Sequence, residues 1–126
     1  MKKQIHTSGA PEAIGPYSQA IICGDTLYAS GQIPIDPTSG KIESDDITEQ
    51  AHRAMKNAGA VLAAAKLGYD DVVKTTVYLA DLGDFGTVNA VYGEYFRAPY
   101  PARSCVQAAA LPRGAKIEVE IIARIK

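Results

Sequence analysis

The clearest hydrophobic pattern in the chain lies between residues 47 and 65. Apolar residues recur there at steps of three and four, which places them in one stripe along an α-helix. These positions are Ile47, Ala51, Ala54, Met55, Ala58, Val61, Leu62 and Ala65. Asp46 can cap the first turn, Glu49 follows three residues later as in a capping box, and Gly68 lies just beyond the end. We therefore predict a long helix between Asp46 and Gly68.

Strand patterns lie on both sides of this helix. Residues 20–23 and 26–30 flank Gly24-Asp25, a pair that predicts a two-residue hairpin turn. The segment 72–79 is rich in β-branched residues, which favours a strand. Alternation assigns its residues to two faces, Val73, Thr75, Val77 and Leu79 against Val72, Lys74, Thr76 and Tyr78. Two more strands are expected at 103–108 and 116–125, joined through residues 111–114.

A second helix is expected to begin at Asp84. Its apolar residues are about one turn apart, and they are Phe85, Val88, Tyr92 and Tyr95. Pro99 and Pro101 forbid its continuation, so an end near Arg97 is expected. The order of elements is then ββ(β)αβαββ, with a third early strand optional. We predict one α+β domain over residues 1–126, with two helices packed on one face of a mixed sheet.

The opposite face of that sheet is also expected to be covered. The last strand has an apolar row that suits the helices, namely Ile117, Val119, Ile121, Ala123 and Ile125. On the other face of the central strand, Val72 and Tyr78 are too apolar to face water comfortably. We expect other copies of the chain to cover this face. A monomer in dilute solution would count against that expectation.

Composition and charge exclude several classes of protein. The chain has 126 residues, with 13 Lys and Arg against 14 Asp and Glu and a net charge of −1, so nucleic acid is an unlikely principal partner. No apolar stretch reaches the roughly 20 residues of a membrane helix, and none follows Lys2 and Lys3 as in a signal peptide. Cys23 and Cys105 are far apart with no Cys-x-x-Cys motif, which indicates reduced thiols and a cytoplasmic location.

Familiar catalytic and cofactor motifs are absent. The chain has no glycine-rich nucleotide loop, no Walker lysine loop, no His-Glu-x-x-His and no Gly-x-Ser-x-Gly. Its two histidines are His6, in the terminal segment, and His52, which we interpret as an ordinary surface residue of the first helix. Since no ligand spacing supports a zinc site, neither a metal nor a cofactor is expected.

The stretch 101–106 is the most informative for chemistry. On a strand, Arg103 and Cys105 point to the same side, and parity places Glu118 on the non-core face of the strand expected to pair with it. One face would then gather a guanidinium, a thiol and a carboxylate, and the guanidinium would be free to bind a substrate carboxylate in bidentate fashion. The alternative is structural, an ion pair from Arg103 to Glu118 or Glu120 that holds two strands together.

Two other stretches are unusual. In residues 13–19 a Gly-Pro turn would present Tyr17 just before the first hairpin strand. In residues 29–32, Ser30 closes a strand and Gly31 permits a ligand to approach the backbone closely. Each stretch taken alone also has a structural reading as a turn, a strand end or a packed tyrosine.

Taken together, these stretches resemble the RidA (YjgF) family across about residues 9 to 125. The resemblance is carried by residues 14–20, 29–34, 73–77, 84–89, 101–106 and 111–120. It implies a chorismate-mutase-like α+β fold, a homotrimer and active sites in clefts between subunits. Intersubunit sites agree with the uncovered sheet face.

The resemblance further implies deamination of reactive 2-imino acids. Enamines and imines such as 2-iminobutanoate and 2-iminopropanoate, released by pyridoxal-phosphate dehydratases from threonine and serine, would be hydrolysed to 2-keto acids and ammonia. By this resemblance Arg103 binds the substrate carboxylate and Glu118 orients the attacking water, with Cys105 beside it. Further pocket positions are Tyr17, Ser30, Gly31 and Asn89.

The residue types suit that chemistry. An imine hydrolyses in water already, so the site must fix its carboxylate and aim a water at C2, and no cofactor is required. Cys105 has no nearby histidine in the sequence to generate a thiolate, so we assign it to shaping the site. Two other functions stay open. One is a sensor that binds small carboxylates without turnover. The other is a ribonuclease or translation inhibitor, which the lack of a basic stripe and of paired histidines disfavours.

Overall fold

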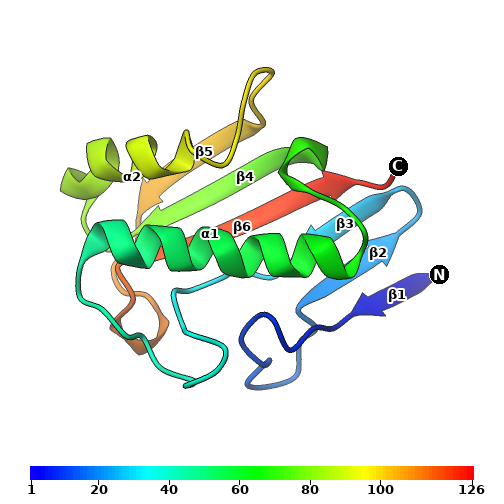
Figure 1. The fold of residues 1–126 in the computed structure, drawn as a ribbon, viewed down its shortest axis with the longest axis horizontal. Coiled ribbons are helices and arrows are strands. Elements are labelled where there is room, and N and C mark those ends of the chain that lie inside the picture. The colour runs from blue at the N-terminus through cyan, green and yellow to red at the C-terminus, as the bar shows by residue number, and fades with distance from the viewer.

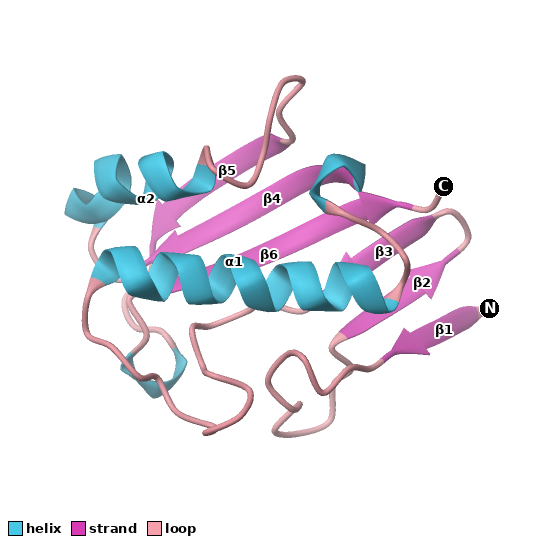
Figure 2. Ribbon diagram, in the orientation of Figure 1, coloured by secondary structure: helices cyan, strands magenta, loops and turns pink.

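The computed structural model describes residues 1–126 as a six-stranded sheet with two α-helices on one face (Figures 1 and 2). The strands are β1 (Lys2–Ile5), β2 (Ala20–Cys23), β3 (Thr26–Ala29), β4 (Val72–Leu79), β5 (Ala102–Gln107) and β6 (Ile117–Arg124), in the sheet order β1-β2-β3-β6-β4-β5. The helices are α1 (Ile47–Ala64) and α2 (Phe85–Tyr92). Only β4 and β5 pair in parallel, across the α2 connection. The predicted α+β class, mixed sheet and one-sided pair of helices are confirmed.

The third strand before the first helix lies at the N-terminus. β1 pairs antiparallel with β2 and forms one edge of the sheet. Its sequence has no strand periodicity, because on this exposed edge only Ile5 is buried and Lys2 and Lys3 face water. Between β3 and α1 there is no further strand, only isolated bridges at Gln32 and Ile35.

Helix α1 begins as predicted and ends differently. The side chain of Asp46 accepts a hydrogen bond from the Glu49 N–H at 3.0 Å, which confirms the cap. The helix ends at Ala64, and Lys66 takes the left-handed conformation with φ 61° that closes the last turn. Gly68, expected to follow the end directly, therefore has no part in terminating the helix.

A β-bulge corrects the predicted faces of β4. The register against β6 shifts between Val72 and Lys74, so two residues of β4 face one position of its partner. As a result Val72 joins the buried row at 6% exposure, whereas Val73 is 51% exposed on the helix-free face. The predicted assignment of these two valines was therefore wrong, while Thr75, Val77 and Leu79 are buried as expected.

Helix α2 is shorter than the sequence suggested. It ends at Tyr92 rather than near Arg97. Asp84 makes no capping hydrogen bond, because it closes a short 3₁₀ turn that Asp81 caps by accepting from the Gly83 N–H. The periodic residues beyond Tyr92 follow an irregular path, which ends the predicted stripe early.

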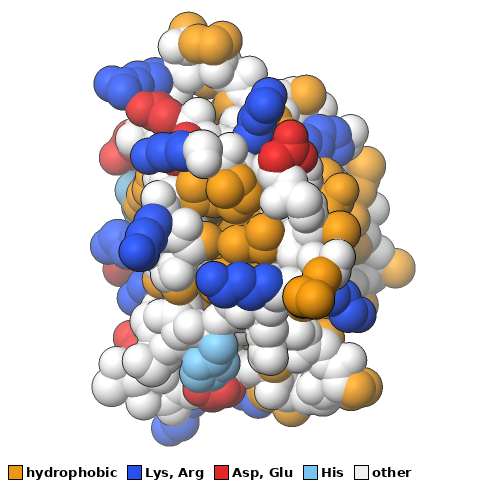
Figure 3. Space-filling view, turned by 90° about the vertical axis from the view of Figure 1, so that its right-hand side faces the viewer, with side chains coloured by type: hydrophobic (Ala, Val, Ile, Leu, Met, Phe, Trp, Pro, Cys, Tyr) orange, Lys and Arg blue, Asp and Glu red, His pale blue; other side chains and the backbone are white.

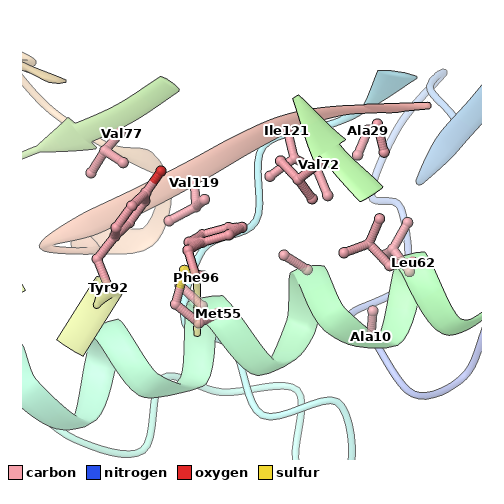
Figure 4. Close-up of a cluster of buried hydrophobic side chains, with 14 of the residues drawn as sticks. Ala10, Ala29, Met55, Leu62, Val72, Val77, Tyr92, Phe96, Val119 and Ile121 are labelled. Atoms are coloured by element: carbon pink, nitrogen blue, oxygen red, sulfur yellow. The ribbon is translucent and has the colours of Figure 1, made fainter. Parts of the chain in front are cut away.

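Strand β5 lies at the second edge of the sheet and contacts β4 alone. The sequence suggested that the strand with Arg103 pairs with the strand with Glu118, but β4 lies between them. The core fills the space between the sheet and both helices, where Met55 of α1, Tyr92 and Phe96 pack against Val77 and Val119 (Figure 4).

Large apolar side chains stay exposed on the face without helices. Tyr28 of β3 and Val73 of β4 are each 51% exposed, and Val106 of β5 is 45% exposed. Figure 3 views the molecule from the end where both termini lie, at a right angle to the view of Figure 1, and shows further hydrophobic side chains at the surface there, among Lys and Arg. The expected uncovered face is therefore present in the single chain.

Candidate active site

Arg103 lies on β5 and is held against α2. Its Nη1 donates a hydrogen bond to Oδ1 of Asn89 at 2.8 Å. Its guanidinium carbon lies 5.4 Å from the centre of the Phe85 ring and 4.8 Å from that of Tyr92, within the range of cation–π attraction. The side chain is exposed and forms no ion pair with a carboxylate of its own chain. Most of its N–H donors are thus available to an incoming anion.

Cys105 accompanies Arg103 on the same face. In the parallel register it lies beside the buried Val77, and its side chain packs against the core. Burial raises the pKa of the thiol, and the nearby Arg103 opposes this only in part. A thiol with a raised pKa is a poor nucleophile at neutral pH, which agrees with a role in shaping the site.

A separate cavity of about 620 Å³ opens on the helix-free face of the sheet. It is lined by Tyr17, Ser30 and Gly31 together with Glu118, Glu120 and Arg113, among others. The segments before and after the first hairpin, which the sequence singled out, therefore meet at the strand that carries Glu118. Arg103, Cys105 and Asn89 do not line this cavity.

Local hydrogen bonds fix the walls of the cavity. The hydroxyl of Ser30 donates to the carbonyl of Ser18 at 2.6 Å, and the hydroxyl of Tyr17 accepts from the Ile14 N–H at 3.3 Å. The buried amide of Gln19 accepts from the Thr7 N–H at 2.7 Å and donates to backbone carbonyls of residues 7–11. These bonds tie the loop that carries Tyr17 to Ser30, just after β3, and to the preceding residues 7–11.

Glu118 is the chemically distinctive group in the cavity. It is half-buried and makes no hydrogen bond within the chain. Burial raises the pKa of its carboxyl group, and the neighbouring Glu120 raises it further. Glu120 itself accepts a hydrogen bond from the Tyr78 hydroxyl at 3.1 Å. A desolvated, unbonded carboxylate is a suitable general base for a water molecule.

Gly31 makes room for this carboxylate. A Cβ atom added to Gly31 would lie 1.8 Å from Oε2 of Glu118. The backbone of Gly31 is not in the left-handed region, so its small size matters here rather than its conformational freedom. The close approach that the sequence suggested is therefore to Glu118.

We expect Gly31→Ala to displace Glu118 and leave folding nearly intact, since the alanine backbone is unstrained at this position. Misplacing a catalytic group by about 1 Å costs on the order of 10² in rate. Catalytic turnover and the midpoint of thermal unfolding measure the two effects. Gly68→Ala is the matched control, because a Cβ there meets nothing within 4 Å. Full activity in Gly31→Ala would refute the role given to this contact.

The prediction that Arg103, Cys105 and Glu118 share one face of the sheet is wrong for a single chain. Arg103 pairs in register with the buried Thr75, whereas Glu118 pairs with Tyr78 on the other side of the sheet. The guanidinium and the carboxylate therefore lie on opposite faces. The structural alternative, an ion pair from Arg103 to Glu118 or Glu120, is absent as well.

Other features add little to the site. His52 is half-buried and hydrogen-bonds through Nδ1 to the Tyr95 hydroxyl at 2.7 Å, so it is better tied than an ordinary surface residue. No group of three or more His, Cys, Asp or Glu side chains is arranged to hold a metal ion. None of the helices is both long and apolar enough to cross a bilayer.

Sequence reasoning missed part of the surroundings of both groups. Phe85 and Tyr92 were assigned only to the core, although with Asn89 they have the i, i+4, i+7 spacing of one helix face. That spacing could have indicated a shared surface for Arg103. Glu120 was considered only as an ion-pair partner, yet its parity with Glu118 places the two carboxylates on one face.

Comparisons with known proteins identify similar chains. A family model described as Endoribonuclease L-PSP matches residues 7–125. The human 2-iminobutanoate/2-iminopropanoate deaminase is 50% identical over 123 residues, which cover 98% of this chain and 90% of the human protein. Two similar crystal structures are Escherichia coli TdcF with bound serine (45% identity, TM-score 0.94) and RidA from the Antarctic bacterium Psychrobacter (42%, 0.94), each covering 98% of this chain and 99% of the other.

Proposed function

The chain belongs to the Endoribonuclease L-PSP (YjgF/RidA) family, and on that premise we propose that it hydrolyses reactive 2-imino acids, such as 2-iminobutanoate and 2-iminopropanoate, to 2-keto acids and ammonia. The observation that carries the proposal is a pair of poised groups: the exposed guanidinium of Arg103, without a carboxylate partner, and the desolvated carboxylate of Glu118, without a hydrogen bond. The deaminase names of relatives near 50% identity support it.

We propose that the working enzyme is a cytoplasmic homotrimer of this domain, with the chorismate-mutase-like architecture. Arg103 and Glu118 lie on opposite faces of one sheet, so a substrate cannot touch both within one chain. The exposed Tyr28, Val73 and Val106 supply an apolar surface for another copy. Head-to-tail association around a threefold axis brings the Arg103 face of one subunit over the Glu118 cavity of the next.

In this arrangement Arg103 binds the substrate carboxylate. A guanidinium offers a planar fork of N–H donors that matches the two oxygens of a carboxylate. Asn89 holds Nη1 from the helix side, which leaves the outer edge of the fork for the substrate. The role of this residue pair is thus capture and orientation.

Glu118 then activates water. Water adds to C2 of the iminium form, and the proton that it loses passes to the Glu118 carboxylate. Glu118 then returns this proton to the nitrogen of the carbinolamine. The C–N bond breaks as the C=O bond forms, and the Glu118 carboxylate takes up the hydroxyl proton, so that ammonia and the 2-keto acid leave. A positioned carboxylate that moves protons in this way contributes roughly 10² to 10⁴ in rate.

The charge of the cavity favours this substrate over RNA. The cavity is lined by three carboxylates, Glu12, Glu118 and Glu120, and by one basic residue, Arg113. The Nη1 of Arg113 donates a hydrogen bond to the Gly40 carbonyl at 3.1 Å. An acidic cavity attracts an iminium cation and repels a phosphodiester. No histidine lines the cavity to cleave RNA by acid–base catalysis. Substitution of Glu118 distinguishes an enzyme from a sensor of small carboxylates, because only the enzyme needs this carboxylate.

The pKa of Glu118 predicts the pH dependence. Because the base must be ionised, activity should fall as pH drops through its raised pKa, at a higher pH than for an exposed glutamate. Glu120→Gln removes a negative charge that raises this pKa and keeps an acceptor for the Tyr78 hydroxyl, so the acidic limb of kcat should move to lower pH. Profiles of kcat against pH for the wild type, Glu120→Gln and the remote control Glu94→Gln measure the shift. A limb unmoved in Glu120→Gln would contradict the coupling.

The proposed activity is tested by producing the imine in place. A pyridoxal-phosphate threonine dehydratase releases 2-iminobutanoate, and its decay to 2-oxobutanoate and ammonia is followed with and without this protein. We expect the protein to accelerate the decay in proportion to its concentration. Decay at the uncatalysed rate would reject the deaminase and favour a binding role.

A further inference from the structure

We infer that Tyr92, fixed by its hydrogen bond to Thr75, is a positioning residue that holds the guanidinium of Arg103 in the orientation that binds carboxylate. The inference rests on the proposed function and deepens it, since it concerns how the carboxylate group is captured. Neither Tyr92 nor Thr75 needs to touch the substrate for this role.

The first step is the contact between Tyr92 and Arg103. The guanidinium carbon is 4.8 Å from the ring centre, closer than its 5.4 Å to the ring of Phe85. Tyr92 is 7% exposed, so its ring is a rigid, desolvated face, whereas Phe85 is 38% exposed. Cation–π attraction strengthens when the ring is shielded from water, so Tyr92 is the stronger of the two contacts.

The second step is the bond that fixes the ring. The hydroxyl of Tyr92 lies 2.8 Å from Oγ1 of Thr75, which is fully buried on β4. In Figure 4 Tyr92 extends from α2 toward β4, with its oxygen near Val77. Thr75 is also the register partner of Arg103 on β5. Thr75 of β4 is therefore next to Arg103 in the sheet and also bonded to the ring that lies under the guanidinium.

Restricting the Arg103 side chain affects KM rather than kcat. An exposed arginine side chain samples many rotamers, and ordering it on binding weakens affinity. A fixed ring and Asn89 together restrict the guanidinium before the substrate arrives. The carboxylate is bound alike in the ground state and the transition state, so loss of this restriction should raise KM and leave kcat nearly unchanged.

The test compares Tyr92→Leu, Tyr92→Phe and Thr75→Val. Tyr92→Leu removes the ring, and we expect KM and the dissociation constant for 2-oxobutanoate to rise about tenfold, with kcat within about twofold of the wild type. Tyr92→Phe keeps the ring but loses the hydrogen bond to Thr75, so affinity should fall only about threefold. Thr75→Val keeps the shape of the side chain but leaves the Tyr92 hydroxyl without its partner, and affinity should fall about threefold.

Tyr95→Leu is the matched control. Tyr95 is a partly buried tyrosine whose hydroxyl is bonded like that of Tyr92, but its partner is His52 and it does not contact Arg103. A purely structural effect would change Tyr92→Leu and Tyr95→Leu alike, and this result would overturn the inference. Wild-type affinity in Tyr92→Leu would overturn it too. If Tyr92→Leu does not fold, wild-type affinity in Thr75→Val would overturn the inference instead.

A spectroscopic readout reports the contact directly. The ring of Tyr92 shields protons that lie over its face, so the guanidinium protons of Arg103 should resonate upfield in the wild type and in Tyr92→Phe, and lose this shift in Tyr92→Leu. Binding of 2-oxobutanoate needs no turnover. If the wild type binds this acid but does not hydrolyse imines, the proposed function fails while the affinities still decide the inference. If it does not bind the acid at all, both are rejected.

Discussion

Glutamine in place of Glu118 should lower kcat for 2-iminobutanoate hydrolysis by roughly 10² to 10⁴, with little change in the affinity for 2-oxobutanoate. Glutamine keeps the size of the side chain but cannot accept the proton that water loses as it attacks C2. Because Glu118 makes no hydrogen bond within its chain, the substitution leaves no buried partner unsatisfied, and folding should be retained. Single-turnover decay of the imine and calorimetric titration with 2-oxobutanoate give the two quantities.

This variant also separates an enzyme from a sensor. A sensor of small carboxylates needs Arg103 alone, so its properties would be unaffected by Glu118→Gln. Wild-type rates of ammonia release in Glu118→Gln would show that the carboxylate has no catalytic part. Binding that is lost along with turnover would indicate that Glu118 holds the ligand rather than activating water.

Lysine in place of Arg103 should lower kcat/KM by about 10- to 100-fold, mainly through KM. An ammonium keeps the charge but presents no planar fork, so one charge-assisted hydrogen bond of a bidentate pair is lost, worth about 1.5–3 kcal/mol. It also loses the contact with Asn89 and the stacking on Tyr92. Steady-state kinetics with the imine, together with titration of 2-oxobutanoate, measure the loss.

Arg97→Lys is the control for that substitution. Arg97 is also exposed, and it is bound to Asp70 through two hydrogen bonds on another part of the surface. Surface ion pairs of this kind contribute little to stability, so Arg97→Lys should behave as the wild type. Equal kinetics in Arg103→Lys and the wild type would remove the carboxylate-binding role.

Periodicity was sufficient for the regular parts of the fold. The stripe of α1 and the alternation in β6 have one buried face each, so their residues specify both the element and its orientation. The hairpin at Gly24 and the cap at Asp46 follow from local turn and cap chemistry. These features depend on neighbours in sequence, which a single sequence records.

Features that depend on tertiary contacts were not predictable in the same way. The bulge that exchanges Val72 and Val73 arises from pairing with β6, and alternation alone cannot place it. The position of β4 between β5 and β6 is a property of topology. It separates Arg103 from Glu118, although parity correctly placed Arg103 and Cys105 on one side of β5.

The candidate site was found in two halves for the same reason. The segments with Tyr17, Ser30 and Gly31 meet Glu118 in one cavity, as their resemblance to the family implied. Arg103, Cys105 and Asn89 gather at the other edge of the sheet. The sequence indicated the residues of both halves. Which of them lie together within one chain depends on the order of the strands in the sheet.

Mixed trimers provide the most direct test of a site completed by a neighbouring subunit. Arg103→Ala and Glu118→Gln subunits, each nearly inactive alone, are unfolded together in equal amounts and refolded. If each site takes its arginine from one subunit and its glutamate from the next, about a quarter of the sites in random trimers contain both wild-type groups, and about a quarter of the wild-type activity should return. A mixture no more active than its two parent variants would contradict the shared site.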